Sequence, residues 1–168
     1  MKIETMQDLF LEQIMDLYDA EQRLVKALPK MAEAAISPQL RQAFQSHLQE
    51  TRTHVDRLDR IFTRMGQKPK TQTCDAMKGL IDEGEDIVSD TDESPVRDAG
   101  LIAAANRVEH YEIAAYGSAR TFATNLGLSD AASLLEQTLE EEKKADAKLT
   151  QLAQSSVNSQ AAQSIPSR

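Results

Sequence analysis

The sequence predicts an all-α protein, an up-down four-helix bundle with a long crossover between its second and third helices. Its composition favours helix, because it is rich in Ala, Leu, Glu, Gln and Lys and has no Trp and few Gly or Pro. Four long stretches carry apolar residues spaced by three and four, as on one face of a helix. A chain of 168 residues can bury one sizeable core. We therefore expect one bundle over residues 1–153 and a separate tail.

The first helix is expected from about Thr5 to Met31. Thr5 reads as its N-cap, and Asp8 three residues later completes an imperfect capping box. Pro29 is expected to kink or end the helix. The inward stripe consists of Phe10, Ile14, Leu17, Glu21, Leu24 and Leu28.

The second helix is expected from Pro38 to about Met65. Ser37 and Pro38 read as N-cap and first helical position, and Gly66 suits the position after the helix. Its apolar seam consists of Phe44, Leu48, Val55, Leu58 and Phe62. The stripe that flanks this seam consists of Leu40, Ala43, His47, Glu50, His54 and Ile61.

Residues 67–95 are too long for a tight turn and carry short apolar patterns between glycines and prolines. We expect a crossover there with one or two short helices. The third long helix should run from about Val96 to Leu126. The fourth should be capped by Ser129 and end near Ala153. Residues 154–168 are rich in Ser, Gln, Ala and Asn, so this tail is expected to be disordered.

Each predicted stripe holds one acidic residue where Leu or Ile would be expected. A buried carboxylate is costly unless a positive group holds it. Four that converge in one core would need a cation, and a pair of metal ions fits best. The spacing from the first to the second acid is 29 residues and from the third to the fourth 30, which suggests an approximate two-fold relation. The four acids are Glu21, Glu50, Glu112 and Glu142.

Further candidate ligands lie one helical turn away on the same faces. His54 follows Glu50, Asp146 follows Glu142, and Glu109 precedes Glu112. His47 precedes Glu50 and competes with His54 as the nitrogen ligand, while Glu141 is an alternative to Glu142. Carboxylate-rich, sulfur-free coordination suits two iron or manganese ions, and zinc remains an option through the histidines.

Two tyrosines lie one turn from predicted ligands. Tyr18 precedes Glu21, and Tyr116 follows Glu112. Each either packs in the core or donates a hydrogen bond to a ligating carboxylate.

Charge and composition exclude several classes of function. The net charge of −8 argues against nucleic acid as a partner. No run of eighteen apolar residues indicates a membrane span, and the N-terminus lacks the apolar region of a signal peptide. Cys74 is the single cysteine, which fits a reducing cytoplasm and rules out an internal disulfide.

Five segments resemble a known family, the YciF-type bacterial stress proteins of the ferritin-like superfamily. They are residues 17–21 (LYDAE), 47–51 (HLQET), 74–81 (CDAMKGLI), 108–117 (VEHYEIAAYG) and 138–143 (TLEEEK). The segment 108–117 is the most specific, and the resemblance extends from about Thr5 to Ala153.

The resemblance implies a ferritin-like bundle, a rubrerythrin-like di-metal centre and a homodimer. The positions that match the family motifs are Glu21, His47, Glu50, Glu109, Glu112, Glu142 and Asp146. Gln is common in the family where this chain has His54, so the resemblance favours His47 as the nitrogen ligand.

Two functions are compatible with these features. In the first, a di-iron centre scavenges peroxide or acts as a ferroxidase. The chain has no rubredoxin-like cysteine quartet, which favours an external reductant or a slow, protective reaction. In the second, the protein is a non-enzymatic stress or structural dimer whose metal site is structural, vestigial or empty. The sequence does not identify catalytic residues.

Overall fold

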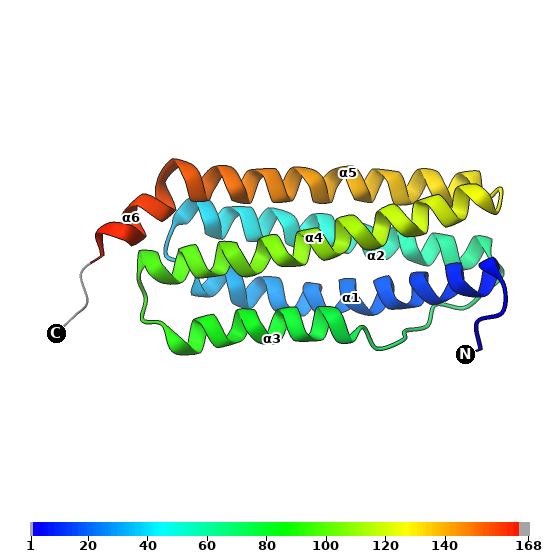
Figure 1. Cartoon of the computed structure of the whole chain (residues 1–168), viewed down its shortest axis with the longest axis horizontal. Coiled ribbons are helices and arrows are strands. Elements are labelled where there is room, and N and C mark those ends of the chain that lie inside the picture. Colours follow the sequence, from blue (N-terminus) through cyan, green and yellow to red (C-terminus); the bar gives the residue numbers. More distant parts are fainter. Residues whose placement is uncertain (1, 165–168) are drawn as a thin grey trace.

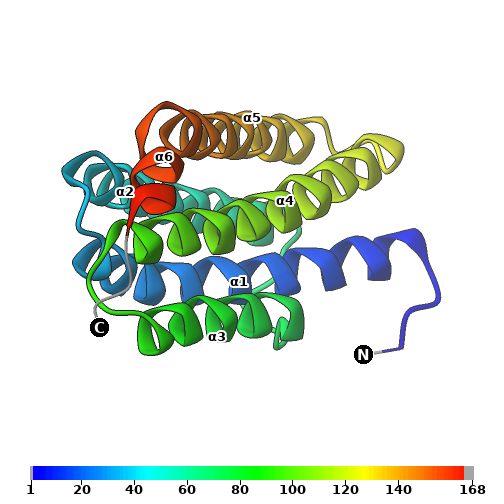
Figure 2. The same ribbon diagram turned by 60° about the vertical axis from the view of Figure 1, so that its left-hand side comes forward.

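Four long helices run side by side in the computed structural model, which describes residues 2–164 (Figure 1). They are α1 (Met6–Ala34), α2 (Pro38–Arg64), α4 (Pro95–Asn125) and α5 (Ser129–Leu152). The crossover contains one helix, α3 (Asp75–Asp90), which lies along α1 and α4 on one side of the bundle (Figure 2). The predicted all-α fold, a ferritin-like four-helix bundle with a long crossover, is confirmed.

Most helix ends follow the predicted capping residues. The Thr5 side chain accepts from the Asp8 N–H at 3.1 Å, and the Asp8 carboxylate accepts from the Thr5 N–H at 2.9 Å, so the capping box is complete. Ser37 caps α2, and Gly66 takes a φ of 66° after it. Pro29 lies inside α1, which continues to Ala34.

The start of α5 differs from the prediction, because Ser129 is the first helical residue rather than the cap. Leu128 occupies the cap position and makes no side-chain capping bond. Its N–H donates to the Ala123 carbonyl at 2.9 Å, and its side chain packs against the core. Gly127, with a φ of 72°, forms the turn between α4 and α5. Tertiary packing therefore decides this boundary.

The expectation of a disordered tail is wrong for the part that the structure describes. A π-helical turn, η1 (Ala153–Val157), continues α5 and leads into α6 (Asn158–Gln163). Val157 is only 3% exposed and packs in the core, and α6 lies against α4. The segment is held by one buried apolar residue, Val157. A single apolar residue does not distinguish a packed segment from a disordered one when the composition is otherwise polar. Residues 165–168 of the expected tail lie outside the described residues.

The core is divided into two apolar clusters. On α2, Leu40 and Phe44 belong to one cluster, whereas Leu58 and Phe62 belong to the other. The other three long helices are divided in the same way, and most of the polar buried residues lie between the two clusters. The fold therefore places a polar layer across the middle of the bundle. No helix of the described residues is long and apolar enough to span a membrane.

Candidate metal centre

All four long helices direct carboxylate or imidazole groups into the polar layer. Helix periodicity explains the alignment, because residues three, four or seven apart share one face. His47 and His54 are seven apart on α2, and Glu109 and Glu112 are three apart on α4. The six groups, each at most 6% exposed, are Glu21, His47, His54, Glu109, Glu112 and Glu142.

These residues form two groups in which potential ligand atoms lie within 4.8 Å of one another. One group contains Glu21, His54 and Glu142, and the other contains His47, Glu109, Glu112 and Glu142. Glu142 belongs to both groups, so its two oxygens lie between them. The structure therefore brings both histidines into the layer, one in each group.

Several buried ligand atoms in the layer have no hydrogen-bond partner. Among the residues that the structure describes, neither oxygen of Glu112 nor of Glu142 has a hydrogen-bond partner, which is rare for buried polar atoms. His54 Nδ1 lies 2.9 Å from Glu142 Oε1, but the angle does not make a hydrogen bond. Carboxylate oxygens and imidazole nitrogens that face one space without partners fit divalent metal ions.

Two carboxylates of the polar layer are costly to ionise. Burial raises the pKa of Glu112 well above its usual 4.5, and the neighbouring carboxylates of Glu142, Glu21 and Glu109 raise it further. Burial also raises the pKa of Glu109 well above 4.5, although the charge of His47 opposes this. Ionised carboxylates here need positive charge that the side chains of the layer do not fully supply.

The two histidines, unlike Glu109 and Glu112, are stabilised in their charged form. Burial disfavours the charged ring of His47, but Glu109, Glu50 and Glu142 outweigh it and raise its pKa to about 9. Burial likewise opposes charge on His54, but Glu21 and Glu142 raise its pKa to about 11. Without metal, both imidazoles are therefore held as cations by the surrounding carboxylates.

The orientation of His54 is set by Glu141, one residue before Glu142. His54 Nε2 lies 2.9 Å from Glu141 Oε2, while Arg57 donates to both oxygens of Glu141. With Nε2 occupied, Nδ1 faces the layer. Glu141 lies on the flank of the layer with a side chain 30% exposed, and Glu142 lies inside it.

Arg57 was not identified from the sequence, although it lies three residues after His54 on the same helix face.

The tyrosines divide between the two expected roles. The buried Tyr116 hydroxyl donates to Glu21 Oε1. Tyr18 packs edge-on against Phe62, with ring centroids 5.4 Å apart.

Two predicted ligands lie outside the buried layer. The Glu50 side chain is 49% exposed, and its Oε2 lies 3.4 Å from His47 Nδ1. The expectation that Glu50 is buried on the inward stripe is wrong, because the inward positions of α2 follow His47, Thr51, His54 and Leu58.

Asp146 lies beyond Glu142 on α5, at the level of Asn106 and His110. It accepts from Asn106 Nδ2 at 2.8 Å and lies 3.2 Å from His110 Nε2. These contacts hold its short side chain away from the layer. Ligand roles for Asp146 and Glu50 stay predictions.

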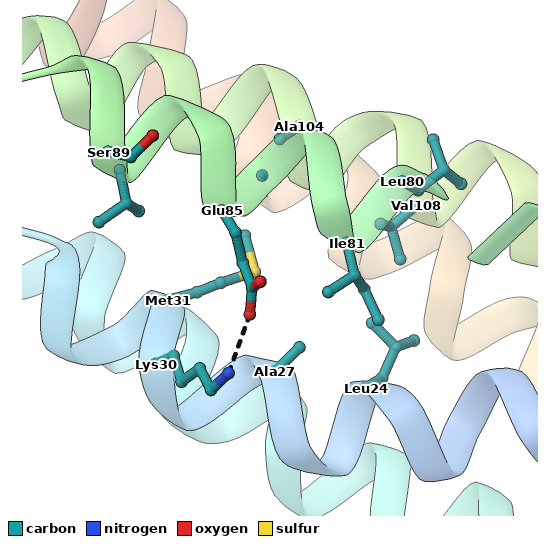
Figure 3. Close-up of a pocket in the computed structure, with 12 residues that line it drawn as sticks. Leu24, Ala27, Lys30, Met31, Leu80, Ile81, Glu85, Ser89, Ala104 and Val108 are labelled. Atoms are coloured by element: carbon teal, nitrogen blue, oxygen red, sulfur yellow. Dashed lines mark hydrogen bonds and ion pairs between the residues drawn. The ribbon is translucent and has the colours of Figure 1, made fainter. Parts of the chain in front are cut away.

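Two cavities differ in their relation to this layer. A cavity of about 340 Å³ between α2 and α5 is lined by His47 and Glu109, and therefore reaches one of the two groups. A second cavity of about 220 Å³ lies between α1, α3 and α4 (Figure 3). Its lining is apolar apart from Lys30 and Glu85, which pair at 2.9 Å, and Ser89. Only the first cavity adjoins the candidate ligands.

Comparisons with known proteins agree with this architecture. Residues 5–162 match a family described as Domain of unknown function (DUF892). Protein YciF of Escherichia coli (strain K12) is 46% identical over 162 residues, which cover 96% of this chain and 98% of that protein. The crystal structure of the E. coli stress protein YciF superposes with a TM-score of 0.89 and 46% identity, covering 93% of this chain and 99% of that one.

Two further structures extend the similarity. YcfI from Rhodopseudomonas palustris is 45% identical with a TM-score of 0.86, covering 89% of this chain and 95% of that one. A two-domain protein from Anabaena variabilis, with DJ-1/ThiJ/PfpI-like and ferritin-like domains, is 18% identical with a TM-score of 0.65. It covers 98% of this chain and 41% of that one, and supports the fold alone.

Proposed function

The chain belongs to the DUF892 family, and from that premise we propose that it is a stress-associated ferritin-like protein with a di-iron centre that consumes peroxide. The association with stress rests on the 46% identical E. coli protein, whose crystal structure is described as that of a stress protein. The single cysteine fits a cytoplasmic location.

One observation carries the metal centre: buried carboxylates and imidazoles with unpaired atoms converge in two groups that share Glu142. Glu21 and His54 would hold one ion, and His47, Glu109 and Glu112 the other. Glu142 would bridge them. Four ionised carboxylates match the charge of two divalent cations, which removes the cost of burying the acids. Mixed carboxylate and imidazole coordination suits iron, with manganese or zinc as alternatives.

The surrounding residues would give the two ions different environments. Two ferrous ions would supply the two electrons that a peroxide takes up on reduction. The Arg57–Glu141 pair closes the His54 side, while the 340 Å³ cavity gives access to the His47 side. Tyr116 holds Glu21 in place. Electrons for further turnover would come from an external reductant. Ferroxidase activity, with O₂ as the oxidant, is the second reaction that this centre supports.

Metal analysis tests the centre directly. Protein grown with iron should contain about two ions per chain, and Glu112→Gln should lose metal and peroxide consumption. Glu140→Gln is the matched control, because Glu140 is exposed on α5 and pairs with Lys143 at 2.7 Å. Anomalous diffraction at the iron edge would identify the metal and its ligands.

A negative result has a defined meaning. Fewer than about half an ion per chain, with stability unchanged by a chelator, would contradict the di-iron centre and favour the non-enzymatic alternative.

The homodimer that the family resemblance implies is part of the proposal, and sedimentation equilibrium would measure it.

A further inference from the structure

The cavity between α2 and α5 has a floor, walls and mouth of different chemistry. Its floor is His47 and Glu109, which belong to the candidate metal centre. Phe44 and Leu149 form apolar walls and are themselves buried. Lys144 and Lys148, both exposed, lie one turn apart on α5 at the mouth. Apolar walls between ionisable groups at the floor and the mouth allow such a cavity to hold and orient a small molecule.

The charged groups that line the cavity differ in whether they have a partner. Each acid that lines the cavity lies near a basic group: Glu50 and Glu109 share His47, which is 3.4 Å from each, and Glu141 pairs with Arg57. Among the residues that the structure describes, neither Lys144 nor Lys148 forms an ion pair, whereas the neighbouring Lys143 pairs with Glu140. In a chain of net charge −8, these lysines place two positive charges at the mouth that no acid of the described residues pairs with directly. These charges favour an anionic ligand over a cationic one.

The size of the cavity also limits the ligand. An apolar protein cavity of about 150 Å³ holds benzene, and this one is about 340 Å³. Small side chains at Ala43, Ser46 and Ala145 leave that space open. Hydrogen peroxide would fill only a small part of it, so the cavity suits a larger organic molecule.

We propose that this cavity binds a small organic anion, with its carboxylate at Lys144 and Lys148 and its apolar body against Phe44 and Leu149. If the proposed function holds, on which this last step rests, the substrate class is an organic hydroperoxide that carries a carboxylate. Its reduction would break the O–O bond, with two electrons from the oxidation of two ferrous ions to ferric and two protons from solvent. The products are the alcohol and water.

Binding is tested without any peroxide, by titrating the purified protein with 4-phenylbutanoate in a calorimeter. The double variant Lys144→Gln/Lys148→Gln should bind this carboxylate about two- to thirtyfold more weakly, the range expected for two exposed charge contacts. Lys143→Gln, one residue away but outside the cavity lining, should bind like the parent. Ala145→Leu should weaken both 4-phenylbutanoate and the uncharged 4-phenylbutanol, because it fills the cavity.

Two results would overturn the binding proposal. One is a parent protein that does not bind 4-phenylbutanoate at millimolar concentration. The other is equal weakening by Lys143→Gln and by the double variant. The exposed lysines are not part of the core, so both variants are expected to fold, and circular dichroism would verify this.

A second assay separates this proposal from the proposed function. With the iron-loaded protein, the double variant should lower the ratio of kcat/KM for a carboxylated aryl hydroperoxide to kcat/KM for hydrogen peroxide. An unchanged ratio would contradict the substrate class. If the parent consumes neither peroxide yet binds 4-phenylbutanoate through the lysines, the proposed function fails and the anion site stands.

Discussion

Glu141 Oε2 lies 2.9 Å from His54 Nε2, which makes this carboxylate the outer partner of a histidine in the candidate metal centre. Arg57 fixes Glu141 in turn through both of its oxygens. A carboxylate in this position sets the tautomer of a ligating histidine and increases its basicity. The pair therefore directs His54 Nδ1 toward Glu21 and Glu142, which lie 3.3 Å and 2.9 Å away.

Glu141→Gln tests this arrangement. The amide is a weaker acceptor for His54 and no longer pairs with Arg57, so metal affinity should fall about 10- to 100-fold. Competition with a chromophoric chelator would measure it. Glu140→Gln changes the neighbouring exposed carboxylate and should leave the affinity unchanged. An equal effect of the two substitutions would contradict a specific role for Glu141.

Glu112→Leu should separate stability from metal binding. Both Glu112 oxygens are buried and have no hydrogen-bond partner among the described residues, so in the absence of metal an apolar side chain of similar size should remove a cost. We expect the free energy of unfolding in chelator to be unchanged or to rise, by up to about 4 kcal/mol, while metal binding is lost. Urea unfolding with and without metal would measure both effects. Lower stability of the metal-free variant would contradict the prediction.

The sequence predicted most of the fold because local signals and tertiary packing agree at most helix ends. Thr5, Ser37 and Gly66 occupy the predicted capping positions. The exceptions are places where packing prevails over local preference. Leu128 replaces Ser129 at the start of α5, and Val157 anchors a segment whose composition favours disorder.

The candidate site was predicted only in part, because a helical stripe defines a face without fixing every residue on it. Acids on apolar stripes located Glu21, Glu112 and Glu142, all now found in the buried layer. A stripe defines a face only to within a fraction of a turn, however, and it could not separate the exposed Glu50 from its inward neighbours. The choice between His47 and His54 had no single answer, because each histidine lies in a different group.

Asp98→Ala should reduce stability without affecting the metal centre. Asp98 is only 2% exposed, and its two oxygens accept from the N–H groups of Ile36 at 2.9 Å and Ser37 at 2.8 Å. These bonds attach the turn between α1 and α2 to the first turn of α4. Their loss leaves two N–H groups unpaired and should cost about 3 kcal/mol, measured by urea unfolding. Asp90→Ala, at the exposed end of α3, is the control, and a loss of metal affinity in Asp98→Ala would contradict the separation of roles.

The metal-free protein should lose stability as the pH rises above neutrality. The pKa of His47 is raised from 6.5 to about 9 and that of His54 from 6.5 to about 11, so both bind protons more tightly in the folded state. Their contribution is complete below pH 6.5 and is lost as the pH rises through about 9 and about 11. Glu109 and Glu112, whose pKa values are raised above 4.5, act in the same direction.

Bound metal should remove this dependence, because the ions displace the protons. We expect the free energy of unfolding in chelator to fall between pH 7 and pH 9.5, by at most about 1.4 kcal/mol per pH unit for each titrating group. In the metal-loaded protein the decline should be much smaller. Glu142 has the opposite effect: burial raises its pKa, but His54 and His47 lower it below 4.5, so its contribution is lost only on acidification. A chelated protein as stable at pH 9.5 as at pH 7 would show that the buried histidines are not held as cations.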